Sequence, residues 1–284
     1  MKTLLLAAAI TAAVAISSAA VAQQVAESPH TLSGNMAIAT DYRFRGISQT
    51  FGEGFFTVGP AIQGGIDYSH AGGLYLGNWN SNVSGNQYPN GASIEMDFYG
   101  GWKWAFGDFG LDVGTIYYAY PGGAKFVTPN GNTTINNWEA YVGGSWKILS
   151  AKYFYSFTDY FGLSQNVVTT LCNPSVGGCT PVSGNGNTKG TQYLTGALNL
   201  EIAPKLTLGA SVGYTWVKHY NALSYFDYKI GLTYDWNGWM LGANVIGTDA
   251  EKNYWYACDQ GCAAGSKVRD IGTVGLVLSV GKTF

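Results

Sequence analysis

The sequence predicts an all-β protein, a transmembrane antiparallel up-and-down β-barrel of about 12 strands. Three observations predict it: apolar and polar residues alternate along many segments, long and short connections alternate between these segments, and aromatic residues gather at segment ends. In the last segment, Val268 to Phe284, apolar residues occupy every second position from 274 to 280, with Gly275 and Ser279 among the residues between them. One face suited to lipid and one suited to water is the pattern of a strand in a membrane barrel.

The N-terminus has the pattern of a secretory signal peptide. Lys2 precedes an apolar run from Leu4 to Ile16, and the segment Ala20-Val21-Ala22 has the small residues that a signal peptidase requires. Beyond Ala22, no uncharged run reaches the roughly 18 residues of a transmembrane helix, which leaves a barrel as the route across a membrane. We expect residues 1–22 to be the signal peptide, 23–33 a short N-terminal periplasmic segment and 34–284 the outer-membrane barrel.

The composition is unusual for a soluble domain. Charged residues make up 11% of the chain, aromatic residues 15%, and 40 of the 284 residues are glycine, whereas soluble domains contain about 25% charged residues. Without Lys2, the remaining 14 basic and 17 acidic residues give a net charge of −3, so the chain has no basic surface for nucleic acid. A soluble β-sandwich with an aromatic core is the alternative, but a sandwich has no need of aromatic belts.

Individual strands are predicted from alternation. The first clear segment runs from Met36 to Arg45 with Tyr42 and Phe44 on its apolar face, and three others begin near Ile94, Leu206 and Phe226. An even number of strands fits bacterial barrels with both termini in the periplasm. Weaker segments, which with the last one bring the total to about 12, begin near Phe56, Leu74, Leu111, Trp138, Lys152, Gln192 and Met240.

The connections give independent support, because bacterial barrels have short periplasmic turns and longer extracellular loops. Every second connection is short, and Asn237-Gly238 is a type I′ hairpin signal. The predicted periplasmic ends carry Trp102, Trp104, Trp146, Tyr234, Trp236 and Trp239, and the predicted outer ends carry Tyr42, Phe44, Tyr117, Tyr214, Trp216 and Phe226.

The polar faces of the strands should line the lumen. Their excess of carboxylates would slightly favour cations, and a closed network of salt bridges is the alternative, because buried charges need partners. A barrel of about 12 strands lies between filled 8-strand barrels and open 16-strand porins, so its size does not decide whether it conducts. Inward tyrosines, among them Tyr99, Tyr118 and Tyr193, would narrow the bore. The predicted lumen-lining residues are Asp41, Arg43, Arg45, Asp67, Glu95, Asp97, Asp112, Glu139, Glu201, Asp227 and Lys229.

The four cysteines fall in two predicted extracellular loops. Cys172 lies close to Cys179 and Cys258 close to Cys262, and the periplasm is oxidising, so we expect one disulfide within each loop. Four cysteines allow three connectivities. A metal site is the alternative, but no histidine lies near either pair.

No catalytic site is expected. The three histidines are His30 in the N-terminal segment, His70 in a short turn and His219 in a long loop. His219 and Asp227 could form an acid–base pair at the rim, but a solvated histidine in a loop is the better explanation of this residue. No glycine motif is placed to bind a nucleotide. We therefore expect no enzyme, no cofactor and no metal.

The segment Asp41-Tyr42-Arg43-Phe44-Arg45-Gly46-Ile47-Ser48-Gln49 resembles the opening motif of the TorF-type porin family of proteobacterial outer-membrane proteins. Further similar stretches include Glu95-Met96-Asp97-Phe98-Tyr99-Gly100-Gly101 and Asp227-Tyr228-Lys229-Ile230-Gly231, so that the resemblance covers most of the chain. It implies an outer-membrane barrel with porin activity and no catalytic or ligand residues. The inserts that carry the cysteines depart from the family pattern.

The sequence thus predicts a narrow passive channel for small hydrophilic solutes in the outer membrane of a Gram-negative bacterium, embedded in lipid. The alternative is a non-conducting barrel whose disulfide-tied loops bind a partner or stiffen the envelope. The solute and the oligomeric state stay open, because lipid-facing and subunit-facing apolar positions look alike.

Overall fold

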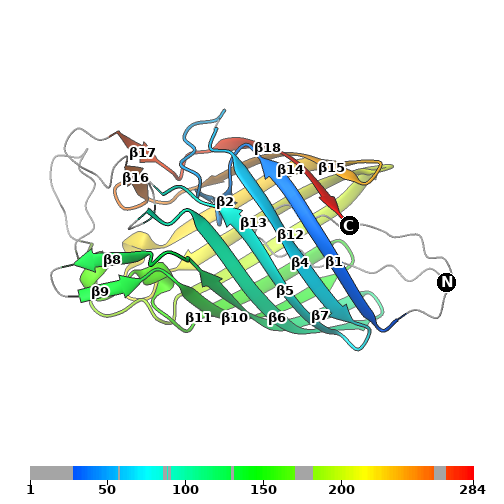
Figure 1. Cartoon of the computed structure of the whole chain (residues 1–284), viewed down its shortest axis with the longest axis horizontal. Coiled ribbons are helices and arrows are strands. Elements are labelled where there is room, and N and C mark those ends of the chain that lie inside the picture. Colours follow the sequence, from blue (N-terminus) through cyan, green and yellow to red (C-terminus); the bar gives the residue numbers. More distant parts are fainter. Residues whose placement is uncertain are drawn as a thin grey trace.

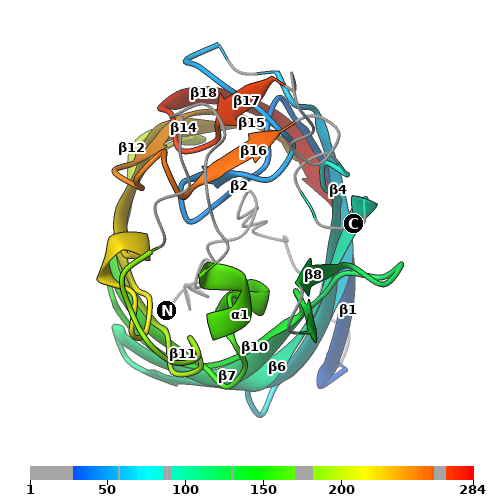
Figure 2. The ribbon, with the colours of Figure 1, turned by 90° about the vertical axis from the view of Figure 1, so that its left-hand side faces the viewer.

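The computed structural model describes residues 28–56, 58–85, 88, 91–128, 131–169, 182–258 and 267–284. Twelve strands form one closed antiparallel barrel (Figures 1 and 2), in the spatial order β1-β18-β15-β14-β13-β12-β11-β10-β7-β6-β5-β4. The first and last strands pair, from Asn35 with Thr283 to Ala39 with Ser279, and this pairing closes the sheet. The predicted fold class and strand number are confirmed.

The barrel strands are β1 (His30–Ala39), β4 (Ala61–His70), β5 (Leu74–Asn82), β6 (Ile94–Phe106), β7 (Phe109–Ala119), β10 (Asn137–Trp146), β11 (Leu149–Ser156), β12 (Gln192–Ala203), β13 (Leu206–Trp216), β14 (Tyr225–Trp236), β15 (Trp239–Thr248) and β18 (Gly275–Thr283). The connections contain the hairpins β2 (Arg43–Phe44) with β3 (Ile47–Ser48), β8 (Lys125–Thr128) with β9 (Gly131–Thr134), and β16 (Tyr256–Cys258) with β17 (Val268–Asp270). They also contain α1 (Gln165–Val168) and the 3₁₀ turns η2 (Tyr160–Gly162) and η4 (Asn221–Leu223).

Alternation along each strand separates an apolar outer face from a polar inner face. In β14, Ile230 and Leu232 are exposed on the outside, whereas Asp227 is buried inside the barrel. Successive side chains of a strand point to opposite sides of the sheet, so the sequence pattern translates directly into two surfaces. Among the described residues, no helix is long and apolar enough to cross a membrane.

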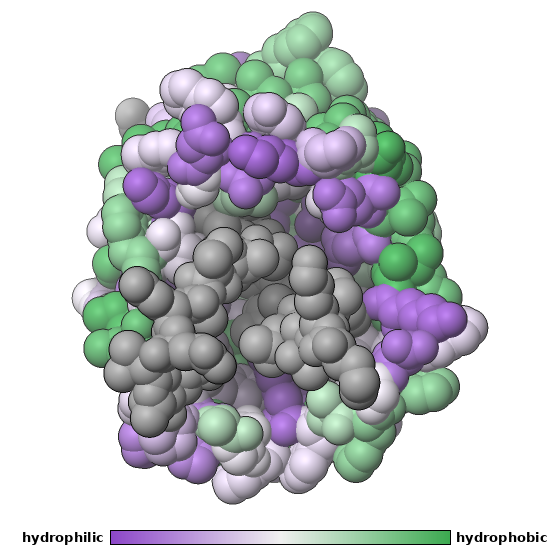
Figure 3. Space-filling model, turned by 90° about the vertical axis from the view of Figure 1, so that its right-hand side faces the viewer, coloured by the Kyte–Doolittle hydropathy of each residue, from purple (hydrophilic) through white to green (hydrophobic). Residues whose placement is uncertain are grey.

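The two ends of the barrel differ. Turns of two or three residues connect the strands at one end, which we call the short-turn end, and Asn237 and Gly238 there have the positive φ angles of 52° and 86° that a type I′ turn requires. Figure 3 looks at this end and shows hydrophilic residues around the mouth, with hydrophobic residues on the flanks. The six aromatic residues predicted for this end are all exposed on the barrel, as Trp102 and Trp236 illustrate.

The opposite end, which we call the long-loop end, is filled by its own loops. Figure 2 looks into it and shows α1 and β2 inside the outline of the barrel, whereas Figure 1 shows the β8–β9 and β16–β17 hairpins beyond the ends of the barrel strands. Val167 and Val168 of α1 pack with Tyr160, Tyr220 and Leu223 in a buried apolar cluster. The segments around α1, η2 and η4 therefore form part of the interior, whereas the β8–β9 hairpin, with Val127, is largely exposed.

The prediction for the first strand is wrong. β1 begins at His30, before the expected boundary at residue 34, and ends at Ala39 rather than continuing to Arg45. The next barrel strand begins at Ala61, not near Phe56. The chain between them turns into the lumen, where Tyr42 and Phe44 are only 2% and 8% exposed, so neither belongs to an outer aromatic belt.

A tight reversal at residues 45 and 46 produces this inward hairpin. Arg45 has φ 46° and Gly46 has φ 83°, a region that glycine adopts without strain. A Cβ on Gly46 would also lie 2.9 Å from the carbonyl oxygen of Gly247 and 3.0 Å from Cβ of Asp227. The turn therefore packs directly against the barrel wall. We call residues 41–50 the lumenal hairpin.

Candidate functional site: the lumen

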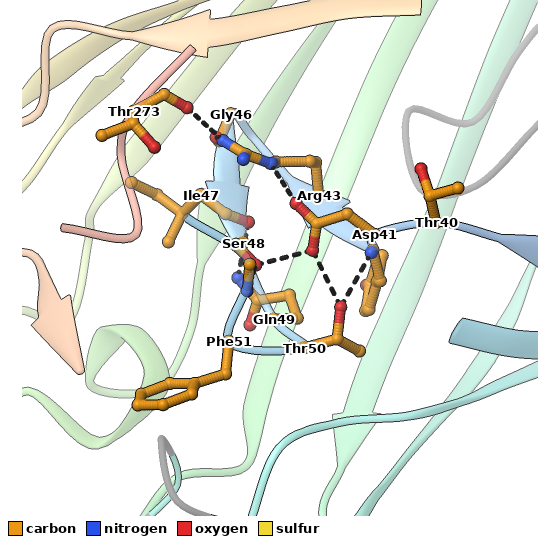
Figure 4. A network of polar contacts seen from close by, with 12 residues as sticks. Thr40, Asp41, Arg43, Gly46, Ile47, Ser48, Gln49, Thr50, Phe51 and Thr273 are labelled. Atoms are coloured by element: carbon orange, nitrogen blue, oxygen red, sulfur yellow. Dashed lines mark hydrogen bonds and ion pairs between the residues drawn. The ribbon is translucent and has the colours of Figure 1, made fainter. Parts of the chain in front are cut away.

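Asp41 organises the lumenal hairpin (Figure 4). Its Oδ1 accepts hydrogen bonds from Ser48 Oγ at 2.7 Å and from Thr50 Oγ1 at 2.8 Å, and its Oδ2 lies 2.6 Å from Arg43 Nε. Thr50 Oγ1 in turn accepts from the backbone N–H of Tyr42 at 3.0 Å. Thr50 thus links the Asp41 carboxylate to the backbone of the same segment. Local hydrogen bonds of this kind favour a turn over a continued strand. The Asp41 carboxylate thus stabilises the hairpin that follows the end of the barrel strand at Ala39.

Arg43 ties the lumenal hairpin to the far end of the sequence. Its Nη1 donates to the backbone carbonyls of Gly46 and Thr273. The backbone N–H of Ser48 donates to the carbonyl of Ile271 at 2.9 Å. The hairpin is therefore held against the segment that leads into β18.

Arg45 fixes the tip of the lumenal hairpin to the opposite wall. Its Nη2 lies 2.6 Å from Glu139 Oε2 of β10, and both side chains are almost fully buried. The guanidinium also lies over aromatic rings, 4.1 Å from the centroid of Tyr193 and 5.3 Å from that of Phe154. Burial alone would lower the pKa of Arg45, but the Glu139 carboxylate raises it well above its ordinary value. The Arg45 side chain is therefore held in the lumen as a cation.

The wall formed by β4 to β7 and β10 carries large side chains bound to carboxylates. Glu95 accepts from the hydroxyls of Tyr42 and Tyr120 at 2.7 and 2.6 Å. Asp112 lies 2.7 Å from Lys152 Nζ and accepts from the Tyr75 hydroxyl at 2.6 Å. Hydroxyl donors and one lysine thus satisfy carboxylates that would otherwise be costly to bury. This half of the lumen is filled.

The wall formed by β12 to β15 and β18 carries the buried Tyr193 and Tyr225, but small inward residues such as Gly209 and Gly231 leave a cavity beside it. This cavity has a volume of about 150 Å³ and lies between the wall and the lumenal hairpin. Its charged lining residues are two carboxylates and three cations, so the carboxylate excess that the sequence predicts for the lumen belongs to the filled half. The lining residues include Gly209, Ser211, Gly231, Thr233, Asn244 and Ser279 from the wall, and Asp41, Arg43, Arg45, Asp227 and Lys229.

The predicted lumen-lining residues divide into three groups. Asp41, Arg43, Arg45, Asp227 and Lys229 line the cavity. Glu201 is exposed near the short-turn end, where it accepts from the backbone N–H of Lys205 at 3.3 Å. Those that lie inside the filled half are Asp67, Glu95, Asp97, Asp112 and Glu139.

The histidines and cysteines stand apart from this site. His219 is exposed, and its Nδ1 lies 3.1 Å from the carbonyl oxygen of Asn187, whereas Asp227 accepts from the Tyr193 hydroxyl at 3.2 Å. No acid–base pair between His219 and Asp227 is formed. Cys258 ends β16 and is disulfide-bonded. Cys172, Cys179 and Cys262 lie outside the described residues, so the predicted pairing stays a prediction.

Sequence reasoning missed the residues that shape the cavity. Ser48, Thr50 and Thr273 hold the lumenal hairpin, and small residues on the inner faces of β13 to β15 make the space. The alternation of Gly209, Ser211 and Gly213 with larger outward residues was the available signal for the small wall.

Three comparisons place the chain among known proteins. The model of a bacterial family of unknown function, Gcw_chp, matches residues 23–284. No curated protein matches the sequence.

Similar solved structures include the KdgM porin in complex with disordered oligogalacturonate, at 12% identity and a TM-score of 0.47 over 89% of this chain and 98% of that one. The NanC porin has 12% identity and a TM-score of 0.47, over 89% of this chain and 99% of that one. OccAB4 of Acinetobacter baumannii has 12% identity and a TM-score of 0.38, over 84% of this chain and 57% of that one. Each is a likeness in fold at low sequence identity.

Proposed function

The chain belongs to the Gcw_chp family of bacterial proteins of unknown function, and we propose that it is a porin of the Gram-negative outer membrane. Small hydrophilic solutes would diffuse through its narrowed lumen. Residues 1–22 would be removed as a signal peptide, with both termini and the short turns in the periplasm. The long loops, with disulfides Cys172–Cys179 and Cys258–Cys262, would face outward. The resemblance to TorF-type porins supports the location in the outer membrane, but not the disulfides, because the inserts that carry the cysteines depart from the family pattern.

One observation carries the proposal: the interior of the barrel is filled on one side only. A purely structural barrel gains stability by filling its lumen with side chains. Here the inner faces of β13 to β15 include glycine, serine, threonine and asparagine, and they leave a cavity of about 150 Å³ with polar and apolar groups in its lining. Small polar residues on a wall that faces a space suit the passage of water and of solutes that form hydrogen bonds.

A matched pair of substitutions on β13 tests the proposal. Ser211 lines the cavity, and its neighbour Val212 is 51% exposed on the outer face. In planar bilayers, the refolded protein should give discrete conductance steps. Ser211→Tyr should lower the conductance because the ring enters the cavity, whereas Val212→Tyr adds a ring on the lipid side and should leave it unchanged. A protein that stays silent across voltage and salt concentration is not a porin.

A non-conducting surface barrel is the second candidate, and the packing of the long-loop end supports it. The lumenal hairpin, α1 and their aromatic neighbours fill this mouth, with two buried ion pairs through Arg43 and Arg45. Such a barrel would act through its outer loops. Silent recordings together with a cell-surface phenotype on removal of the two cysteine-bearing loops would favour this candidate.

A further inference from the structure

The cavity holds buried polar atoms that have no partner. Nη2 of Arg43, Oδ2 of Asp227 and Oγ of Ser279 are all buried and without a hydrogen bond in the described part of the chain, and all three residues line the same cavity. Buried polar groups are nearly always paired, and leaving one unpaired costs free energy. Three such atoms around one space therefore indicate that something other than the protein binds there.

Two charges of this cavity also lack an ion-pair partner. Arg43 is paired with Asp41 and Arg45 with Glu139. Neither Lys229 nor Asp227 forms an ion pair with any described residue. The two lie two positions apart on the inner face of β14, about 7 Å along the strand. The uncompensated charges of the cavity are thus one cation and one anion, within the span of a small molecule.

We propose that this cavity is a binding subsite for small zwitterions, molecules that carry one carboxylate and one ammonium group. The inference deepens the proposed porin function and rests on it. The ligand carboxylate would accept from Arg43 Nη2 and from the Lys229 ammonium. The ligand ammonium would donate to Asp227 Oδ2 and to Ser279 Oγ. Both charges of the cavity would then be satisfied in charge-assisted hydrogen bonds, with no change in net charge.

Solutes with a single charge fit less well. An anion would bind Lys229 but leave the buried Asp227 without an ion-pair partner, and a cation would bind Asp227 but leave the half-buried Lys229 without one. An uncompensated buried charge is expensive. The size of the cavity sets the second limit: since one water occupies about 30 Å³ in the liquid, a cavity of about 150 Å³ holds about five waters. The ligand should therefore be of the size of an amino acid and not of an oligosaccharide.

Four probes of nearly equal size test the charge requirement. Serine is a zwitterion, glycerate an anion, serinol a cation, and glycerol is neutral. Titration calorimetry of the full-length, refolded protein should show serine binding about tenfold more tightly than glycerate or serinol, since a hydrogen bond to a charged group is worth at least that factor. Glycerol should show no binding. Serine binding no more tightly than glycerol would overturn the inference.

Two isosteric or near-isosteric variants should give opposite patterns. Asp227→Asn should weaken the binding of serine and serinol about tenfold, and it should not weaken the binding of glycerate, because it removes a like charge from the cavity. Lys229→Gln should weaken serine and glycerate and leave serinol unchanged. The control is Asp108→Asn, which removes one carboxylate from an exposed turn outside the cavity and should change none of the four. If both cavity variants weaken the binding of all four probes equally, the charges of Asp227 and Lys229 do not determine which probe binds, and the inference fails.

Permeation is measured separately, by swelling of proteoliposomes in the same four solutes. Binding of serine without permeation would refute the proposed porin function and leave the subsite standing. Permeation of all four solutes at equal rates, without preferential binding of serine, would refute the subsite and leave the porin standing.

Discussion

Arg45 is the residue whose loss should most change both the stability and the conductance of the barrel. Its guanidinium crosses the lumen from the lumenal hairpin to Glu139 at 2.6 Å, and it lies over the rings of Phe44, Phe154, Tyr160 and Tyr193. Arg45→Ala would leave the Glu139 carboxylate buried, with the Tyr118 hydroxyl at 3.4 Å as the remaining donor among the described side chains. The hairpin would also lose its attachment to β10.

The expected loss is about 3 to 5 kcal/mol, the range for breaking a buried ion pair by removing one partner. It should be read from urea unfolding in lipid vesicles, by linear extrapolation of the free energy of unfolding. Arg45→Ala combined with Glu139→Gln removes the stranded charge and should recover about 2 kcal/mol of that loss. As a surface control, Lys147→Ala breaks an exposed pair with Asp108 at 3.9 Å and should cost less than about 1 kcal/mol.

The same variant should raise the single-channel conductance, because a hairpin released from β10 no longer narrows the lumen. Two results would refute the reasoning. Arg45→Ala as stable as the parent protein would mean that the ion pair contributes nothing. A double variant no more stable than Arg45→Ala would mean that the cost does not arise from the buried Glu139 charge.

The remaining predictions concern the wall, the turn and the filled half. Ile230→Lys should destabilise the folded barrel in vesicles by about 2 to 4 kcal/mol, because residue 230 points outward. The neighbouring Lys229 points inward, where a lysine is tolerated. A variant as stable as the parent protein would mean that the two faces of β14 are assigned the wrong way round. Gly46→Ala should lower the free energy of unfolding by roughly 2 kcal/mol or more, because the residue combines φ 83° with a close approach to Gly247. Its control is Gly54→Ala, at φ 79° with open space around it, which should lower that free energy by only about 1 kcal/mol in the same urea titration. Asp97→Asn should raise the free energy of unfolding by roughly 1 kcal/mol, because Asp97 is buried with its Oδ1 unpartnered. A variant less stable than the parent protein would show that a donor binds this oxygen in the parent.

The wall of the barrel could be predicted from the sequence because its causes are local. Alternation with a period of two residues indicates which face is apolar and points outward, and β14 shows the same faces in the structure as in the sequence. Turn chemistry is equally local: Asn237-Gly238 adopts the positive φ angles that the dipeptide predicts. Strand number and order follow from these two signals.

The lumenal hairpin could not be predicted in this way, because its alternating residues mimic a strand. Asp41, Arg43 and Arg45 alternate with Tyr42 and Phe44 as they would in the wall. The distinction comes from distant partners, since Glu95, Glu139 and Thr273 bind this segment from elsewhere in the chain. The turn residue Gly46 was the one local sign of a reversal.

The distribution of side-chain size around the barrel, rather than the number of strands, decides where a path can exist. On β5, β7 and β10 the inward positions hold Tyr75, Tyr118 and Tyr141, which reach into the lumen and bind carboxylates or each other. On β13 and β14 the corresponding positions hold Gly209, Ser211, Gly231 and Thr233, which end close to the wall. The lumenal hairpin packs toward the large side chains through Tyr42 and Arg45. The described side chains thus fill one half of the lumen and leave a cavity in the other, and Arg43, Asp227 and Lys229 are among the charged groups that line this cavity.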